Sequence, residues 1–182
     1  MSRRFTRVIA SAVGALFVFL IVVMAVSSNR KTGETAATPL MLKPAPEIST
    51  TTYDDETFLL SRRRGSWVVL NFFNSTCIPC KREHPELVKF FESQRQLGAS
   101  GAELYTVVND DDERAVRAFF DENGGGWPVL HDENAEIAVD YGVAKVPETW
   151  IISPTGVVAQ RFTGEITAEI LGASIAAMSG DS

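Results

Sequence analysis

The strongest constraint on the fold is a pair of cysteines between a strand-like segment and a helix-like segment. Cys77 and Cys80 are the only two cysteines among the 182 residues. The run before them, residues 67–73, is apolar and rich in β-favouring residues, and residues 81–96 after them have the spacing of an amphipathic helix. The sequence therefore predicts a strand that ends at a Cys-x-x-Cys motif, and a helix that begins there.

This motif indicates chemistry, because a disulfide within it closes too small a loop to stabilise a fold through chain entropy. The unpaired N–H groups of a helix's first turn favour an anion, and they lower a thiol pKa from its ordinary value of about 8.5. We expect Cys77, at the end of the loop, to be the attacking sulfur, and Cys80 to resolve the mixed disulfide. Pro79 fits the first turn, where a missing N–H costs nothing. A structural zinc site would need two further ligands, and His84 and His131 are far apart in the sequence.

The N-terminal segment predicts a membrane location. Arg3, Arg4 and Arg7 precede residues 8–26, which carry no charge. As a helix rising about 1.5 Å per residue, such a run can cross a hydrocarbon core of about 30 Å. We expect residues 1–27 to be a single-pass anchor with a cytoplasmic N-terminus and the rest of the chain extracytoplasmic. A cleaved signal peptide, cut after residues 25–27, stays open as an alternative.

The remainder is predicted to be a linker followed by one domain. Residues 28–45 mix Ser, Thr, Ala, Pro and Gly without an apolar period, which is typical of a flexible linker. Residues 46–182 have the length of a single domain. Residues 1–31 contain five basic and no acidic residues, which leaves 12 basic and 23 acidic residues and a net charge of −11 for the rest. A nucleic acid is therefore not expected as a partner.

Strands and helices are predicted to alternate along this domain. A hairpin is expected over residues 48–60, with its turn at Asp54-Asp55. The other expected elements are a strand at 103–109, a helix opened by the acidic residues 110–113 and ending near 122, an extended segment at 127–131, a helix at 133–141, strands at 149–152 and 157–163, and a helix at 166–178. Parallel strands joined by helices and followed by an antiparallel hairpin predict an α/β fold with a mixed central sheet and helices on both faces.

Two segments carry a resemblance to a known family. Residues 67–73 lead into Cys-Ile-Pro-Cys-Lys-Arg-Glu-His-Pro at 77–85, and residues 141–149 read Tyr-Gly-Val-Ala-Lys-Val-Pro-Glu-Thr. With them, residues 44–178 resemble the membrane-anchored, thioredoxin-like thiol–disulfide oxidoreductases of the TlpA/ResA/CcmG type, which serve cytochrome c biogenesis. The resemblance implies a thioredoxin-like fold with an N-terminal β-hairpin extension, and a redox-active Cys77–Cys80 disulfide in place of any other cofactor.

The resemblance also implies roles for residues around the cysteines. Pro147 would follow a cis peptide bond and pack beside the disulfide, and the backbone of Val146 would pair with a bound substrate strand. Glu83 matches an acid that reducing members of the family place near the active site, where a carboxylate can accept the proton of the second thiol. Ordinary thioredoxins carry a buried Asp where this chain has Asn71, so Glu83 or Glu148 would have to replace that acceptor.

Partners are likewise implied by the resemblance. The electron donor would be a membrane thiol protein of the DsbD/CcdA type, and the substrate would be the oxidised haem-attachment cysteines of apocytochrome c. Thr76 stands where most relatives have a tryptophan, which bears on partner preference, and His84 is expected to be structural. Two alternatives stay open: a disulfide-forming oxidase of the same fold, and copper delivery through the two cysteines and His131.

Overall fold

The computed structural model describes residues 13–20 and 33–180. The chain divides into two units, Met1–Lys31 and Thr32–Ser182. In the first unit, residues 13–20 are helical, and the predicted anchor of residues 1–27 lies largely outside the described residues. Within the described ranges, no helix has both the length and the apolar character needed to cross a membrane.

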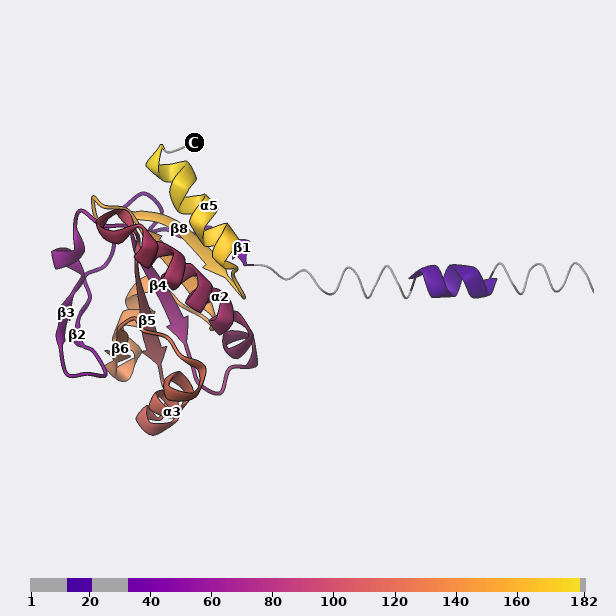
Figure 1. Cartoon of the computed structure of the whole chain (residues 1–182), viewed down its shortest axis with the longest axis horizontal. Coiled ribbons are helices and arrows are strands. Elements are labelled where there is room, and N and C mark those ends of the chain that lie inside the picture. Colours follow the sequence, from indigo (N-terminus) through magenta and orange to yellow (C-terminus); the bar gives the residue numbers. More distant parts are fainter. Residues whose placement is uncertain (1–12, 21–32, 181–182) are drawn as a thin grey trace, which may run out of the picture. The chain divides into compact units, whose positions relative to one another are not determined.

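The second unit is built on a mixed six-stranded sheet with the strand order β1-β8-β7-β4-β5-β6 (Figure 1). Its strands are β1 (Glu34–Thr35), β4 (Val68–Phe73), β5 (Glu103–Asn109), β6 (Val129–Asp132), β7 (Glu148–Ile152) and β8 (Val158–Thr163). Strand β5 runs parallel to β4 and to β6, whereas β7 is antiparallel to β4 and to β8. A separate antiparallel hairpin, β2 (Ser49–Thr51) and β3 (Thr57–Leu59), lies near the N-terminus of the unit. The predicted mixed sheet and hairpin extension are confirmed.

Helices cover both faces of this sheet (Figure 1). The α-helices are α2 (Ile78–Gln96), α3 (Glu113–Asn123), α4 (Glu136–Tyr141) and α5 (Ala168–Ser179), and single 3₁₀ turns lie at Leu60–Arg63, Gly98–Ser100 and Glu133–Ala135. Strand β4 is buried along its whole length. Its Val69 packs in one cluster with residues of α2 and α5, and its Leu70 packs in another with residues of α4 and the hairpin. Burial on both faces explains why β4 reads as a continuous apolar run.

The predicted linker is too long at its C-terminal end. Strand β1 pairs with β8, the N–H of Leu42 donates to Val158 O at 2.9 Å, and the N–H of Ala45 donates to Gly156 O at 3.0 Å. Residues 34–45 therefore belong to the folded domain. These backbone hydrogen bonds leave no periodic trace in the sequence, which is why composition alone predicted a linker from 28 to 45.

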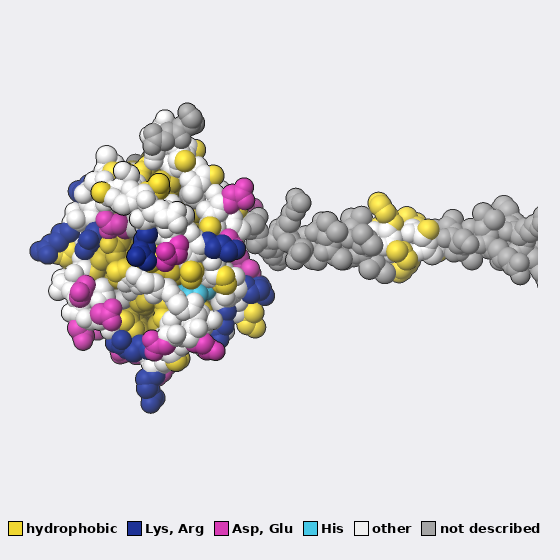
Figure 2. All heavy atoms as spheres, in the orientation of Figure 1, with side chains coloured by type: hydrophobic (Ala, Val, Ile, Leu, Met, Phe, Trp, Pro, Cys, Tyr) yellow, Lys and Arg dark blue, Asp and Glu magenta, His cyan; other side chains and the backbone are white. Residues whose placement is uncertain are grey.

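Charged side chains of both signs are interspersed on the face of this domain that Figure 2 shows. Helix α2, for example, carries the exposed ion pairs Lys89–Glu86 and Arg95–Glu92, each between residues three apart. Such exposed pairs contribute only about 0–1 kcal/mol each to stability. These two pairs therefore add little to the stability of α2.

Candidate active site

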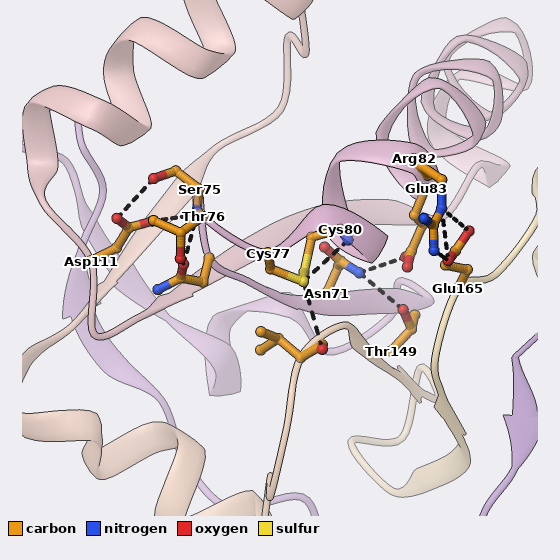
Figure 3. Close-up of a disulfide and its surroundings, with 12 residues drawn as sticks. Asn71, Ser75, Thr76, Cys77, Cys80, Arg82, Glu83, Asp111, Thr149 and Glu165 are labelled. Carbon is orange, nitrogen blue, oxygen red and sulfur yellow. Dashed lines mark hydrogen bonds and ion pairs between the residues drawn. A yellow bond between two sulfur atoms is a disulfide. The ribbon is translucent and has the colours of Figure 1, made fainter.

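The two cysteines form a disulfide at the junction of β4 and α2 (Figure 3). Cys77 is the N-cap residue of α2, and its Sγ accepts a hydrogen bond from the N–H of Cys80 at 3.2 Å. Cys80 is buried, at 2% exposure, whereas Cys77 is partly exposed. The predicted strand, motif and helix are confirmed, and the difference in exposure suits attack by Cys77 and resolution by Cys80.

The loop before Cys77 is fastened to the loop after β5. The hydroxyl of Ser75 donates to Asp111 Oδ1 at 2.8 Å, and the backbone N–H of Ser75 donates to the other oxygen of the same carboxylate. Within the loop, the N–H of Thr76 donates to Asn74 Oδ1 at 2.9 Å. From the sequence, Asp111 was expected only to be one of the acidic residues 110–113 that open the following helix. The actual N-cap of α3 is Asp112, and Asp111 holds the active-site loop instead.

The Val146-Pro147 peptide bond is cis, as the resemblance implies, and it lies beside the disulfide. The carbonyl oxygen of Val146 is 3.7 Å from Cys77 Sγ. A reduced Cys77 could donate its thiol proton to this oxygen. The fold therefore brings the segment before β7 against the start of α2. Val146 and Cys77, which meet there, are 69 positions apart in the sequence.

Glu83 lies one turn after Cys80 on α2 and is buried, at 2% exposure. The side-chain N–H₂ of Asn71 donates to Glu83 Oε1 at 2.8 Å and to the hydroxyl oxygen of Thr149 at 3.1 Å. Figure 3 shows Asn71 between the cysteine pair and Glu83. Among the described residues, Oε2 of Glu83 is buried and has no partner at normal hydrogen-bond geometry, although the backbone N–H of Ile166 lies near the carboxylate.

This environment changes the acidity of Glu83. Burial raises the pKa of the carboxyl to about 8, and the nearby carboxylate of Glu165 adds to the rise. The backbone N–H of Ile166 and the side chains of Asn71 and Thr149 oppose it. A carboxyl with this pKa exchanges protons close to neutral pH, and such groups are typical of functional sites.

Glu148, the other acid expected near the cysteines, is committed to a buried ion pair. Its Oε1 lies 2.7 Å from Arg161 Nε and its Oε2 lies 2.9 Å from the Nη2 of the same guanidinium. The indole N–H of Trp150 also donates to Oε1, at 2.9 Å. Both carboxylate oxygens of Glu148 thus have partners, and the side chain anchors the start of β7.

The two histidines take no part in the site. Nε2 of His84 lies 2.7 Å from the carbonyl oxygen of Gly124, its ring contacts Phe119 and Phe120 edge to face, and burial lowers its pKa. His131 stacks on Tyr53, with ring centroids 4.0 Å apart. Among residues 13–20 and 33–180, no group of three His, Cys, Asp or Glu side chains is placed to hold a metal ion. Copper delivery thus gains no support from the geometry.

We expect His84→Ala to lower the free energy of unfolding by about 2–4 kcal/mol, because it leaves a cavity among aromatic rings and removes a buried hydrogen bond. Urea unfolding measures this loss. At a temperature where the variant is folded, exchange with a small aromatic disulfide should stay within about twofold of wild type, since the ring nitrogen Nε2 bonds the Gly124 carbonyl and not a sulfur. Exchange slowed by an order of magnitude in the folded variant would instead assign His84 a catalytic role.

Comparison with known proteins places this site in a family. A family model described as the AhpC/TSA family matches residues 41–161. The thiol-disulfide oxidoreductase ResA of Bacillus thuringiensis (strain Al Hakam) is 30% identical over 129 residues, which are 71% of this chain and 73% of that protein. The chain belongs to the AhpC/TSA family and, within it, to the ResA-type thiol–disulfide oxidoreductases.

Other relatives agree with this assignment. ResA of Oceanobacillus iheyensis is 33% identical over 118 residues, which are 65% of this chain and about three fifths, 60%, of that protein. The crystal structure of StoA from Bacillus subtilis superimposes with a TM-score of 0.62 at 22% identity, covering 75% of this chain and 99% of that one. At this identity the likeness to StoA shows the fold, which is thioredoxin-like, as expected.

For this ResA-type oxidoreductase, two side chains of the site were not found from the sequence. Arg161 holds Glu148, and Asp111 holds Ser75. The only signal for Arg161 was a basic residue in a predicted strand, and its partner depends on the register of β7 and β8, which places Arg161 opposite Trp150.

Proposed function

We propose that this protein reduces disulfides in protein clients outside the cytoplasmic membrane. The thiolate of Cys77 attacks a client disulfide, forms a mixed disulfide with one client sulfur and releases the other as a thiolate. Cys80 then loses its proton and attacks Cys77 Sγ, which closes the Cys77–Cys80 disulfide and releases the second client sulfur. Two electrons pass from the cysteine pair to the client in each cycle.

The observation that carries this proposal is the buried carboxyl of Glu83 one turn from Cys80. Cys80 lies in a cluster with apolar and aromatic residues, including Phe73 and Val108, where a thiolate is poorly solvated. Its proton therefore needs an acceptor, and Asn71 cannot serve as one. In the oxidised state, a pKa of about 8 keeps Glu83 protonated at neutral pH. This is the state expected after Glu83 has taken the proton of Cys80, and Glu83 can return it when Cys80 is next reduced.

For the client and the donor we rely on the family resemblance. We propose that the client is the oxidised haem-attachment motif of apocytochrome c and that a membrane thiol protein of the DsbD/CcdA type restores the dithiol. The likeness to proteins named ResA supports this assignment, and the uncharged run at residues 8–26 supports an anchor that leaves the domain extracytoplasmic. Val146 is partly buried, and its carbonyl oxygen beside Cys77 offers a place for a client strand.

A trapping variant tests the exchange itself. In Cys80→Ser the mixed disulfide cannot be resolved, so Cys77 should retain its client covalently. The complex should appear as a band of higher mass on a non-reducing gel and disappear when reductant is added. Cys77→Ser is the matched control and should capture nothing. Failure of Cys80→Ser to capture an oxidised Cys-x-x-Cys-His peptide would reject exchange through Cys77.

The reduction potential tests the direction. Known Cys-x-x-Cys proteins range from about −270 mV in thioredoxin to about −120 mV in DsbA. We expect equilibration with glutathione or dithiothreitol to place this protein at the thioredoxin end. A value close to that of DsbA would reject the reductase in favour of the disulfide-forming oxidase.

A further inference from the structure

The segment that faces Cys77 has no regular secondary structure of its own. Residues 143–147 connect α4 to β7 without helix or strand, and they carry the Val146 carbonyl 3.7 Å from Cys77 Sγ. Such a segment keeps its place only if its two ends are held. Its first end follows Gly142, the C-cap of α4, and its second end leads into Glu148, the first residue of β7.

Arg161 on β8 contacts both ends of this segment. Its guanidinium forms the two-pronged ion pair with Glu148, at 2.7 and 2.9 Å, and its Nη2 also reaches the carbonyl oxygen of Gly142 at 3.5 Å. The guanidinium carbon lies 5.1 Å from the ring centroid of Trp150, whose indole N–H donates to the same carboxylate. One side chain thus joins the end of α4 to the start of β7.

This arrangement is buried and geometrically specific. The Glu148 side chain is 1% exposed and that of Arg161 14% exposed. A planar guanidinium matches both oxygens of a carboxylate at once, whereas a lysine ammonium is a single point of charge on a flexible stem. The contacts of the guanidinium are with Glu148, with Trp150 and with backbone carbonyl oxygens, and none is with a sulfur. We therefore expect any effect on exchange to pass through the segment that Arg161 holds.

We propose that Arg161 is a positioning residue, which holds residues 143–147 against Cys77 and thereby provides an ordered backbone for the strand of a protein client. The inference rests on the proposed function and deepens it, because a client strand binds more tightly to a segment whose ordering cost has already been met in the free protein. It also gives Glu148 a structural part in the site, because that carboxylate anchors the segment.

The test compares two substrates in Arg161→Lys and Arg161→Met. One is a peptide with an oxidised Cys-x-x-Cys-His motif, which needs a docking strand, and the other is 5,5′-dithiobis(2-nitrobenzoate), which has no backbone to dock. We expect KM for the peptide to rise about tenfold in Arg161→Met, with a smaller rise in Arg161→Lys, while kcat and the rate with the small disulfide change less than about twofold. Arg95→Met, which removes an exposed ion pair of α2, should match wild type with both substrates.

An unchanged peptide KM in the folded variants, or a parallel loss with both substrates, would overturn the positioning role. If Arg161→Met does not fold, the double variant Glu148→Gln/Arg161→Met, which buries no charge, takes its place. A second readout needs no client: amide hydrogen exchange at residues 143–146 of the oxidised protein should quicken in the Arg161 variants and not in Arg95→Met. If the wild type leaves the peptide disulfide unreduced, the proposed function fails, and hydrogen exchange alone then decides the role of Arg161.

Discussion

The free energy of unfolding of the oxidised protein should fall as the pH rises from about 4.5 to about 8, and Glu83→Gln should remove most of that fall. The pKa of Glu83 is raised from 4.5 to about 8 in the folded protein, chiefly by burial. Between these values the unfolded chain has released this proton and the folded protein still holds it, so the unfolded state binds fewer protons. The stabilising contribution is complete below about pH 4.5 and is lost by about pH 8, at up to about 1.4 kcal/mol per pH unit.

Urea unfolding at pH 5 and pH 8 measures this difference. Wild type and Glu83→Gln should have similar stability at pH 5, where Glu83 is protonated, and the variant should be the more stable of the two at pH 8. Glu92→Gln, an exposed acid on the same helix, is the matched control and should follow wild type. A parallel loss of stability in wild type and Glu83→Gln would show that Glu83 titrates at its ordinary pKa.

Arg161→Met should lower the free energy of unfolding by about 3–5 kcal/mol, because removing one partner of a buried ion pair leaves the other charge without compensation. Here the stranded charge would be Glu148, which is 1% exposed. A second change, Glu148→Gln, removes that charge while keeping an oxygen for the indole N–H of Trp150. The double variant should therefore recover much of the loss.

Chemical denaturation at pH 7 decides this prediction. Arg95→Met should change the unfolding free energy by less than about 0.5 kcal/mol, as expected for an exposed pair. If Glu148→Gln does not restore stability to Arg161→Met, the loss comes from the packing of the Arg161 stem on Trp150 and not from the uncompensated charge.

The sequence predicted most of the elements, because buried parallel strands leave long apolar runs. Strand β5 was predicted with the bounds it has, residues 103–109, and β4 at 67–73 differs by one residue from Val68–Phe73. The helix after the cysteines begins at Ile78, three residues before the amphipathic stretch, since the motif itself forms its first turn. Hydrophobic periodicity shows which face of a helix is buried, but it does not show where the helix begins. The first residue of α2 follows from Cys77, which is its N-cap.

Other features of the site could not be predicted from hydrophobic periodicity and residue spacing. The positions of Glu83 and Pro147 near the cysteines came from the family resemblance, because spacing alone shows an acid on a helix and a proline before a strand. The bond between Ser75 and Asp111 joins residues 36 positions apart and depends on how two loops meet. The pair of Arg161 with Glu148 depends on the register of a hairpin. Such contacts follow from three-dimensional placement, which a single sequence does not encode locally.

Both outer margins of the sheet are occupied by other parts of the same chain. Strand β1 lies along β8, and beyond β6 the N–H of Tyr53 donates to Val129 O at 2.8 Å while Thr52 forms a bridge with Leu130. Open strand edges are where chains add to one another and aggregate. Along β8 and β6, a second copy of this protein therefore finds backbone that residues 34–35 and 52–53 already pair, which opposes polymerisation through these strands.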